Sequence, residues 1–123
     1  MQRTWIGLGA LCGFGAVAMA AMAAHGLAKL DPVALAAVRG GIEIEGWHAL
    51  ALLAVGLWVP RGGKLADAAG AAFAVGTALF CGAVYAVGLF DVRLGLIAPI
   101  GGTLLMVGWG LLGASALTGV VVK

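Results

Sequence analysis

Charged side chains are scarce in this chain. Lys and Arg number seven and Asp and Glu five, so charged residues make up 10% of the sequence, while hydrophobic residues make up 63%. Soluble domains are about 25% charged and about 45–50% apolar, so the composition excludes an ordinary water-soluble domain. The net charge of +2 offers no basic surface for nucleic acid. We expect residues 1–123 to form a single transmembrane domain.

Cysteine and serine are also rare. Cys12 and Cys81 stand inside apolar runs, where they are interpreted as small buried hydrophobes and not as a disulfide framework. Ser115 stands alone, and no residue near Cys81 in the sequence offers a base. No loop that cradles a phosphate is visible. These absences argue against hydrolase and nucleotide chemistry, so we expect a non-enzymatic protein without a cofactor or metal ion.

Long uncharged runs dominate the chain. A membrane-spanning helix needs about 20 mostly apolar residues, and the runs predict spans at about 4–26, 42–60, 66–90 and 94–119. Asp31-Pro32 favours a helix start and Gly40-Gly41 a helix stop, which predicts a short interfacial helix at about 32–39. The predicted fold is therefore all-α, an integral membrane bundle of four transmembrane helices with an interfacial helix between the first and second.

The first run has a second interpretation, as a cleaved signal peptide. Met1-Gln2-Arg3 is a short basic start, and Ala18-Met19-Ala20 has the small-residue pattern of a cleavage site.

Basic residues predict the orientation. Four spans would place both termini on one side with the turn at 60–64, and this side would hold four of the seven basic residues: Arg3, Arg61, Lys64 and Lys123. The other side would hold Lys29, Arg39 and Arg93. The positive-inside rule then predicts a multi-pass protein with cytoplasmic termini.

Glycines mark expected helix contacts. Gly9 and Gly13 form a GxxxG pattern in the first span, and in the last span two pairs recur seven residues apart, Gly95 with Gly102 and Gly101 with Gly108. Small residues at such spacings let helix backbones approach closely in a membrane. Pro99 is expected to kink the last helix.

The second run begins with polar residues. Only 15 uncharged residues separate Glu45 from Arg61, about 22 Å of helix against a hydrocarbon core of about 30 Å. We therefore expect the turn carrying Glu43 and Glu45 at the outer interface or slightly below it. His25 ends the first span, His48 follows Glu45, and Tyr85 lies about 9 Å inside the third span. These five residues are predicted to form one polar cluster at the outer level of the membrane.

The cluster has several interpretations. One interpretation is a hydrogen-bonded network that fixes helix register. The other is a binding site, because ionisable groups within a span often mark function. Glu45-x-x-His48 has the spacing of carboxylate-bridged di-iron bundles, but those sites need two such motifs and this chain has one. A mononuclear metal site from His25, Glu45 and His48 and a haem held by the two histidines are further alternatives.

Several motifs occur in an order that resembles a known family. They are Ala24-His25-Gly26-Leu27, Gly41-Ile42-Glu43 with the segment 47–53, the segment 76–85, Pro99-Ile100-Gly101-Gly102, and Gly108-Trp109. The chain resembles the YgdD-like family, domain of unknown function 423, which is related to eukaryotic transmembrane protein 256. The resemblance runs from about residue 5 to 117. It implies a small four-helix protein of the bacterial inner membrane whose first span is retained, and it supplies no reaction.

The resemblance also ranks the polar residues. Its motif positions include His25, Glu43, His48, Tyr85 and Pro99, with Gly101 and Gly102. The chain departs at four positions, where Ile44 replaces a common aromatic, Glu45 a common Gln, Cys81 a frequent Ser and Ala98 a frequent Thr. The resemblance therefore favours Glu43, His48 and His25 over Glu45 as site residues.

Two functions remain open from the sequence. The first is an accessory, assembly or stabilising component that associates with other membrane proteins or with itself in the lipid bilayer, without nucleic acid. The alternative is a small carrier or binder of a proton, metal ion, lipid or quinone-like ligand at the outer polar cluster.

Overall fold

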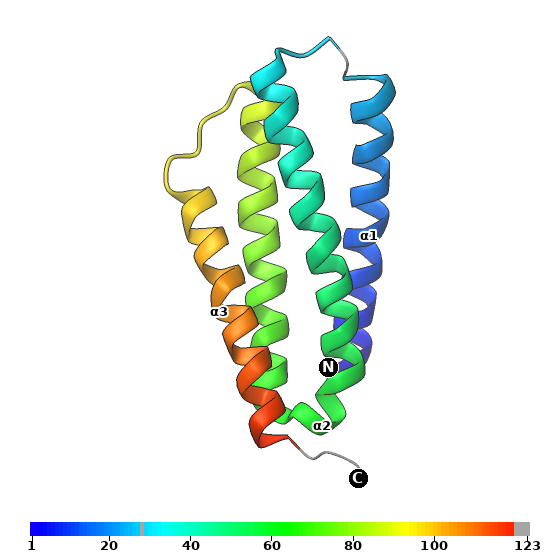
Figure 1. Cartoon of the computed structure of the whole chain (residues 1–123), viewed down its shortest axis with the longest axis vertical. Helices are drawn as coiled ribbons and strands as arrows, with labels where there is room; N and C mark the ends of the chain where they lie inside the picture. The colour runs from blue at the N-terminus through cyan, green and yellow to red at the C-terminus, as the bar shows by residue number, and fades with distance from the viewer. Residues whose placement is uncertain (28, 120–123) are drawn as a thin grey trace.

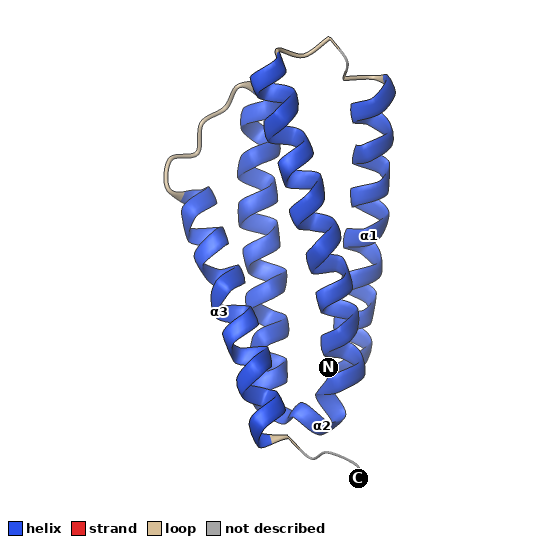
Figure 2. Ribbon diagram, in the orientation of Figure 1, coloured by secondary structure: helices blue, strands red, loops and turns tan. Residues whose placement is uncertain are grey.

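Three helices make up almost all of the computed structural model, which describes residues 1–27 and 29–119. They are α1 (Gln2–His25), α2 (Pro32–Phe90) and α3 (Ile97–Thr118), and Figure 2 shows them joined by short loops. Each is long and apolar enough to cross a membrane. Lys123, which the orientation prediction counts, lies outside the described residues.

The middle helix is bent back on itself. A straight helix of 59 residues would be about 89 Å long, nearly three times the hydrocarbon core of a bilayer. The helix reverses at Gly63, whose φ of 63° and ψ of −146° are not helical and suit a residue without a Cβ. Residues 32–62 form the first arm of α2 and residues 64–90 the second arm, and the two arms lie side by side (Figure 1).

The predicted bundle of four transmembrane helices with a separate interfacial helix is wrong. No fourth helix is present in residues 1–27 and 29–119. The predicted elements at 32–39, 42–60 and 66–90 are all parts of α2. Its start at Asp31-Pro32 is as expected, since Asp31 accepts a hydrogen bond from the Ala34 N–H at 3.4 Å. The expected stop at Gly40-Gly41 fails because the chain stays helical there, and Gly41 instead packs directly against Tyr85.

The two arms of α2 hold α1 and α3 apart. Both outer helices pack on α2, and they flank it in Figure 1. The start of α1, the bend at Gly63 and the end of α3 lie at one end of the molecule. Side chains from all three helices form the core, which is centred on Leu52, Val55 and Phe73.

Glycines set the closest helix contacts. A Cβ added to Gly9 of α1 would lie 2.8 Å from the Ala49 carbonyl oxygen, and a Cβ on Gly101 of α3 would lie 2.5 Å from the Phe80 nitrogen and 2.9 Å from the Gly76 oxygen. These distances are shorter than a van der Waals contact, so a larger residue would force the helices apart. Small residues that let backbones meet are a common basis of helix association in membranes.

Candidate functional site

The first arm of α2 carries polar residues well inside the span. Arg39 and Arg61 bracket 33 Å of this helix, at about 1.5 Å per residue, close to the thickness of the hydrocarbon core. On this scale Glu45 lies about 9 Å and His48 about 14 Å beyond Arg39. Both residues therefore lie beyond the first turns of α2 and not in the first turn of a helix, because the helix begins at Pro32 and not near residue 42.

Glu45, on the first arm of α2, contacts both the second arm of α2 and α1. Its Oε1 accepts a hydrogen bond from the Tyr85 hydroxyl of the second arm at 2.7 Å. Its Oε2 lies against α1 at Gly15, where an added Cβ would be only 2.6 Å from this oxygen. The lack of a side chain at Gly15 thus makes room for the carboxylate between the helices. A hydrogen bond to a carboxylate is stronger than one between neutral groups, so this contact helps to fix the register of the two arms.

A groove of about 320 Å³ opens beside this carboxylate. We call it the Glu45 groove. Its walls are Leu8, Leu11 and Cys12 of α1, Glu45 and Leu52 of the first arm, and Ala74, Thr77, Ala78, Cys81, Gly82 and Tyr85 of the second arm. Leu11 is 67% exposed, so the groove opens to the side, toward the surrounding lipid. Most of its lining is apolar, and the polar atoms come from one carboxylate, two hydroxyls and two thiols.

His48 belongs to a separate contact. It is 3% exposed, and its Nε2 lies 3.0 Å from Trp109 Nε1 of α3. Because an indole N–H only donates, Nε2 must accept, so the proton of the neutral ring is on Nδ1, which donates to the Ile44 carbonyl at 2.7 Å. The ring also packs against Phe73 with centroids 5.4 Å apart. Both ring nitrogens are thus occupied by protein groups, one within α2 and one on α3, and the bond to Trp109 ties α2 to α3.

The predicted polar cluster is divided in the structure. Glu45 and Tyr85 meet, and His48 lies with Trp109. His25 is exposed in the last turn of α1, and Glu43 is exposed two residues from Glu45. Within the described residues no three His, Cys, Asp or Glu side chains gather closely enough to hold a metal ion. The set considered for a mononuclear site is therefore not assembled.

The glycines predicted to pack lie in different surroundings. A Cβ on Gly13 would lie 3.7 Å from the Ala49 Cβ, and one on Gly108 would lie 2.7 Å from the Phe73 ring, whereas one on Gly102 would meet only an ordinary contact, 3.8 Å from Phe80. Gly95 precedes α3, which begins at Ile97.

Pro99 occupies the first turn of α3. The missing N–H of proline removes no intrahelical hydrogen bond at this position. The sequence prediction had placed Pro99 deeper, in a helix starting at residue 94.

Three tryptophans make contacts that the sequence analysis missed. Trp5 donates to Asp67 at 2.7 Å, Trp58 to Ser115 at 2.9 Å, and Trp109 to His48. The sequence does offer one signal for these contacts. A buried indole N–H usually finds a hydrogen-bond acceptor, and a chain so poor in polar residues has few side chains that can be that acceptor. The sequence does not show which acceptor each indole meets, because that depends on the register of the helices.

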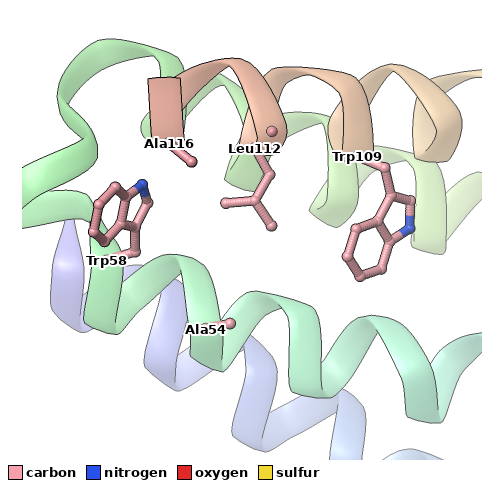
Figure 3. A pocket seen from close by; sticks show the side chains of 6 residues that line it. Ala54, Trp58, Trp109, Leu112 and Ala116 are labelled. Atoms are coloured by element: carbon pink, nitrogen blue, oxygen red, sulfur yellow. The ribbon is translucent and has the colours of Figure 1, made fainter. Parts of the chain in front are cut away.

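A second groove lies between the first arm of α2 and α3. We call it the tryptophan groove, with a volume of about 460 Å³ and a lining of Ala54, Trp58, Trp109, Leu112, Gly113 and Ala116. Figure 3 shows Trp58 and Trp109 at its two ends, reaching in from opposite walls, with Leu112 between them. Since both indole N–H groups bond within the molecule, this groove presents almost only apolar surface.

Comparisons with known proteins identify the family. The sequence model of a family described as "Protein of unknown function (DUF423)" matches residues 19–102. The chain belongs to this family. It is 39% identical to the UPF0382 membrane protein of Haemophilus influenzae over 89% of this chain and 90% of that protein. It is 32% identical to the UPF0382 inner membrane protein YgdD of Escherichia coli, over 88% and 85% respectively.

The relatives in the DUF423 family are named as membrane proteins, which agrees with the apolar composition of this chain. A UPF0382 membrane protein of Staphylococcus epidermidis is also similar, 36% identical over 88% of this chain and 90% of its own length. No solved structure matches the chain. The YgdD-like resemblance is therefore confirmed, and the chain is a small multi-pass membrane protein, like its inner membrane relatives. The link to eukaryotic transmembrane protein 256 stays a prediction.

Proposed function

We propose that this DUF423 protein is a non-enzymatic component of the bacterial inner membrane that associates with other membrane proteins and stabilises or assists them. The tryptophan groove carries the proposal. It runs between two membrane-spanning segments, it is apolar, and it is lined on both sides by small residues, Ala54 on α2 and Gly113 and Ala116 on α3. Such surfaces suit the side of a partner's transmembrane helix.

The small amount of chain outside the long helices supports a role in association with other membrane proteins. Its described residues are almost all in three long apolar helices, so the surfaces on offer are mainly those facing lipid or other helices. The groove holds no free indole N–H, because Trp58 and Trp109 donate within the molecule. It therefore offers shape and apolar contact to a partner.

A groove-filling variant tests the proposal. A Cβ on Gly113 would meet nothing within 4 Å, so Gly113→Leu fills the groove without disturbing the fold. Gly110→Leu is the matched control, since Gly110 is equally free of neighbours and does not line the groove. We expect protein extracted in mild detergent to retain a stoichiometric partner in the wild type and Gly110→Leu. In Gly113→Leu we expect it to lose at least about nine tenths of this partner, a tenfold effect equivalent to about 1.4 kcal/mol.

The readout is quantitative mass spectrometry of tagged protein expressed at native level and extracted in mild detergent. A protein that runs alone, with neither partner nor self-association, contradicts the proposal. Equal partner loss in the two leucine variants also contradicts it, because the groove would then play no part.

The predicted cytoplasmic termini belong to the same proposal. The start of α1 lies at the end of the molecule that carries Arg3, Arg61 and Lys64, and basic residues favour the cytoplasmic side.

A further inference from the structure

We infer that the Glu45 groove is a binding site for a lipophilic molecule whose head carries an O–H or N–H hydrogen-bond donor and no anionic group. Within residues 1–27 and 29–119, no residue lines both this groove and the tryptophan groove, so the inference goes beyond the proposed association and does not depend on it.

The first argument is the carboxylate. Glu45 Oε1 accepts from Tyr85, while Oε2, the oxygen against Gly15, accepts no hydrogen bond from the described residues. A carboxylate has room for about four hydrogen bonds, and in surroundings this apolar an unmet acceptor is costly. A donor entering the groove would satisfy this oxygen.

The second argument is Thr77, which lines the groove from the second arm. It is 4% exposed, and within the described residues its hydroxyl has no hydrogen-bond partner. A threonine inside a helix commonly bonds to a carbonyl of the preceding turn, so a buried unpaired hydroxyl here needs an explanation. Both Glu45 and Thr77 line the groove, so a ligand there is placed to supply a hydrogen-bond partner.

The third argument is the shape and depth of the groove. Its volume of about 320 Å³ is at the lower end of the range of small-ligand sites. Glu45 lies about 9 Å beyond Arg39 along the helix, inside the apolar zone, and the exposed Leu11 and Gly82 leave the groove open toward lipid. A molecule in the bilayer can therefore enter from the side, with its chain along Leu8 and Ala78.

The charge of the site limits the head of the ligand. A phospholipid head would bring its phosphate next to the Glu45 carboxylate, and like charges at close range in a weakly polar setting repel strongly. Among the described residues, no basic side chain lines the groove to offset that repulsion. A single-chain amine or alcohol carries the required donor without an anion.

Three single-chain probes separate the possible heads. Dodecylamine carries charge and N–H donors, 1-dodecanol carries an O–H donor without charge, and dodecyltrimethylammonium carries charge without a donor. Native mass spectrometry from nonionic detergent counts bound molecules per chain. We expect one dodecylamine per chain and at least tenfold weaker binding of dodecyltrimethylammonium. Dodecanol binding close to that of the amine would assign a hydroxyl ligand, and binding more than tenfold weaker would assign an ammonium ligand.

Matched variants locate the binding. Glu45→Gln is expected to weaken dodecylamine binding at least tenfold, whereas Glu43→Gln, two residues away and outside the groove, is expected to leave it unchanged. Gly82→Leu should block the groove without removing any polar group, because a Cβ at Gly82 meets nothing within 4 Å. Gly110→Leu on α3 is its control.

Two results would overturn the inference. One is equal binding to the Glu45→Gln and Glu43→Gln variants together with unchanged binding to Gly82→Leu. The other is dodecyltrimethylammonium binding as tight as that of dodecylamine. If Glu45→Gln fails to fold, as judged by circular dichroism, the Gly82→Leu comparison alone decides the matter.

Discussion

Replacing Gly101 by valine is expected to lower the free energy of unfolding by about 3 kcal/mol, the upper part of the range for overpacking a close contact. The added Cβ would lie 2.5 Å from the Phe80 nitrogen and 2.9 Å from the Gly76 oxygen. Both are backbone atoms, which cannot rotate away, so α3 must separate from the second arm of α2. Unfolding by sodium dodecyl sulfate in mixed micelles, followed by circular dichroism, gives the value.

Gly110→Val is the control for the intrinsic cost of valine in a helix. Gly110 lies on the same helix and has no atom within 4 Å of its added Cβ, so its variant is expected to change stability by less than about 0.5 kcal/mol. Equal effects at both positions would show that the contact between Gly76 and Gly101 does not hold α3 in place.

Replacing His48 by alanine is expected to destabilise the protein by about 3 kcal/mol. The substitution leaves a cavity beside Phe73 and removes the acceptor of the Trp109 N–H, and large-to-small changes in a core typically cost 2–5 kcal/mol. The same mixed-micelle unfolding measures it.

His48→Phe separates the two contributions. The phenyl ring keeps most of the contact with Phe73 but bonds neither Trp109 nor the Ile44 carbonyl. Hydrogen bonds inside membrane proteins average about 0.6 kcal/mol and reach about 1.7 kcal/mol, so we expect a loss of about 1 kcal/mol. A loss as large as that of His48→Ala would mean that the hydrogen bonds, and not the packing, dominate this contact.

The class of the protein followed from its composition, but its helix count did not. The apolar runs placed helical, membrane-spanning segments correctly in all three helices. The number failed because the turn expected at 60–64 is a bend at Gly63 within α2, so the spans predicted at 42–60 and 66–90 belong to one helix. The separate interfacial helix failed because glycine pairs occur both at helix ends and at close helix contacts. Gly40-Gly41 has the composition of a helix stop, yet Gly41 serves to admit the Tyr85 ring. Which of these two roles applies depends on a partner more than 40 residues away in the sequence.

The candidate site shows a similar limit. Counting residues from Asp91 placed Tyr85 within the membrane, and the structure brings it to Glu45. The start of the helix that carries Glu45 was missed because an uncharged run does not show where its helix begins, which is at Pro32 and not near residue 42. The resemblance favoured Glu43, His48 and His25, whereas the structure exposes Glu43 and His25. The roles of these residues in binding stay predictions.

The register of α1 on α2 sets the Glu45 carboxylate against Gly15, so the Glu45 groove depends on it. One disulfide tests it directly. The Cβ of a residue at Gly13 would lie 3.7 Å from the Ala49 Cβ, within the 3.5–4.5 Å range typical of disulfides. With Cys12 and Cys81 replaced by serine, we expect Gly13→Cys with Ala49→Cys to oxidise almost completely, seen by mass spectrometry as loss of thiol labelling.

Leu50 supplies the comparison, since it neighbours Ala49 but is 68% exposed. Gly13→Cys with Leu50→Cys is expected to remain reduced under the same oxidation in the membrane. If this pair forms the disulfide and the pair at residues 13 and 49 does not, α1 has a different register or face on α2. A slip of one helical turn, about 5.4 Å, would take Gly15 away from Glu45 and contradict the structure of the Glu45 groove.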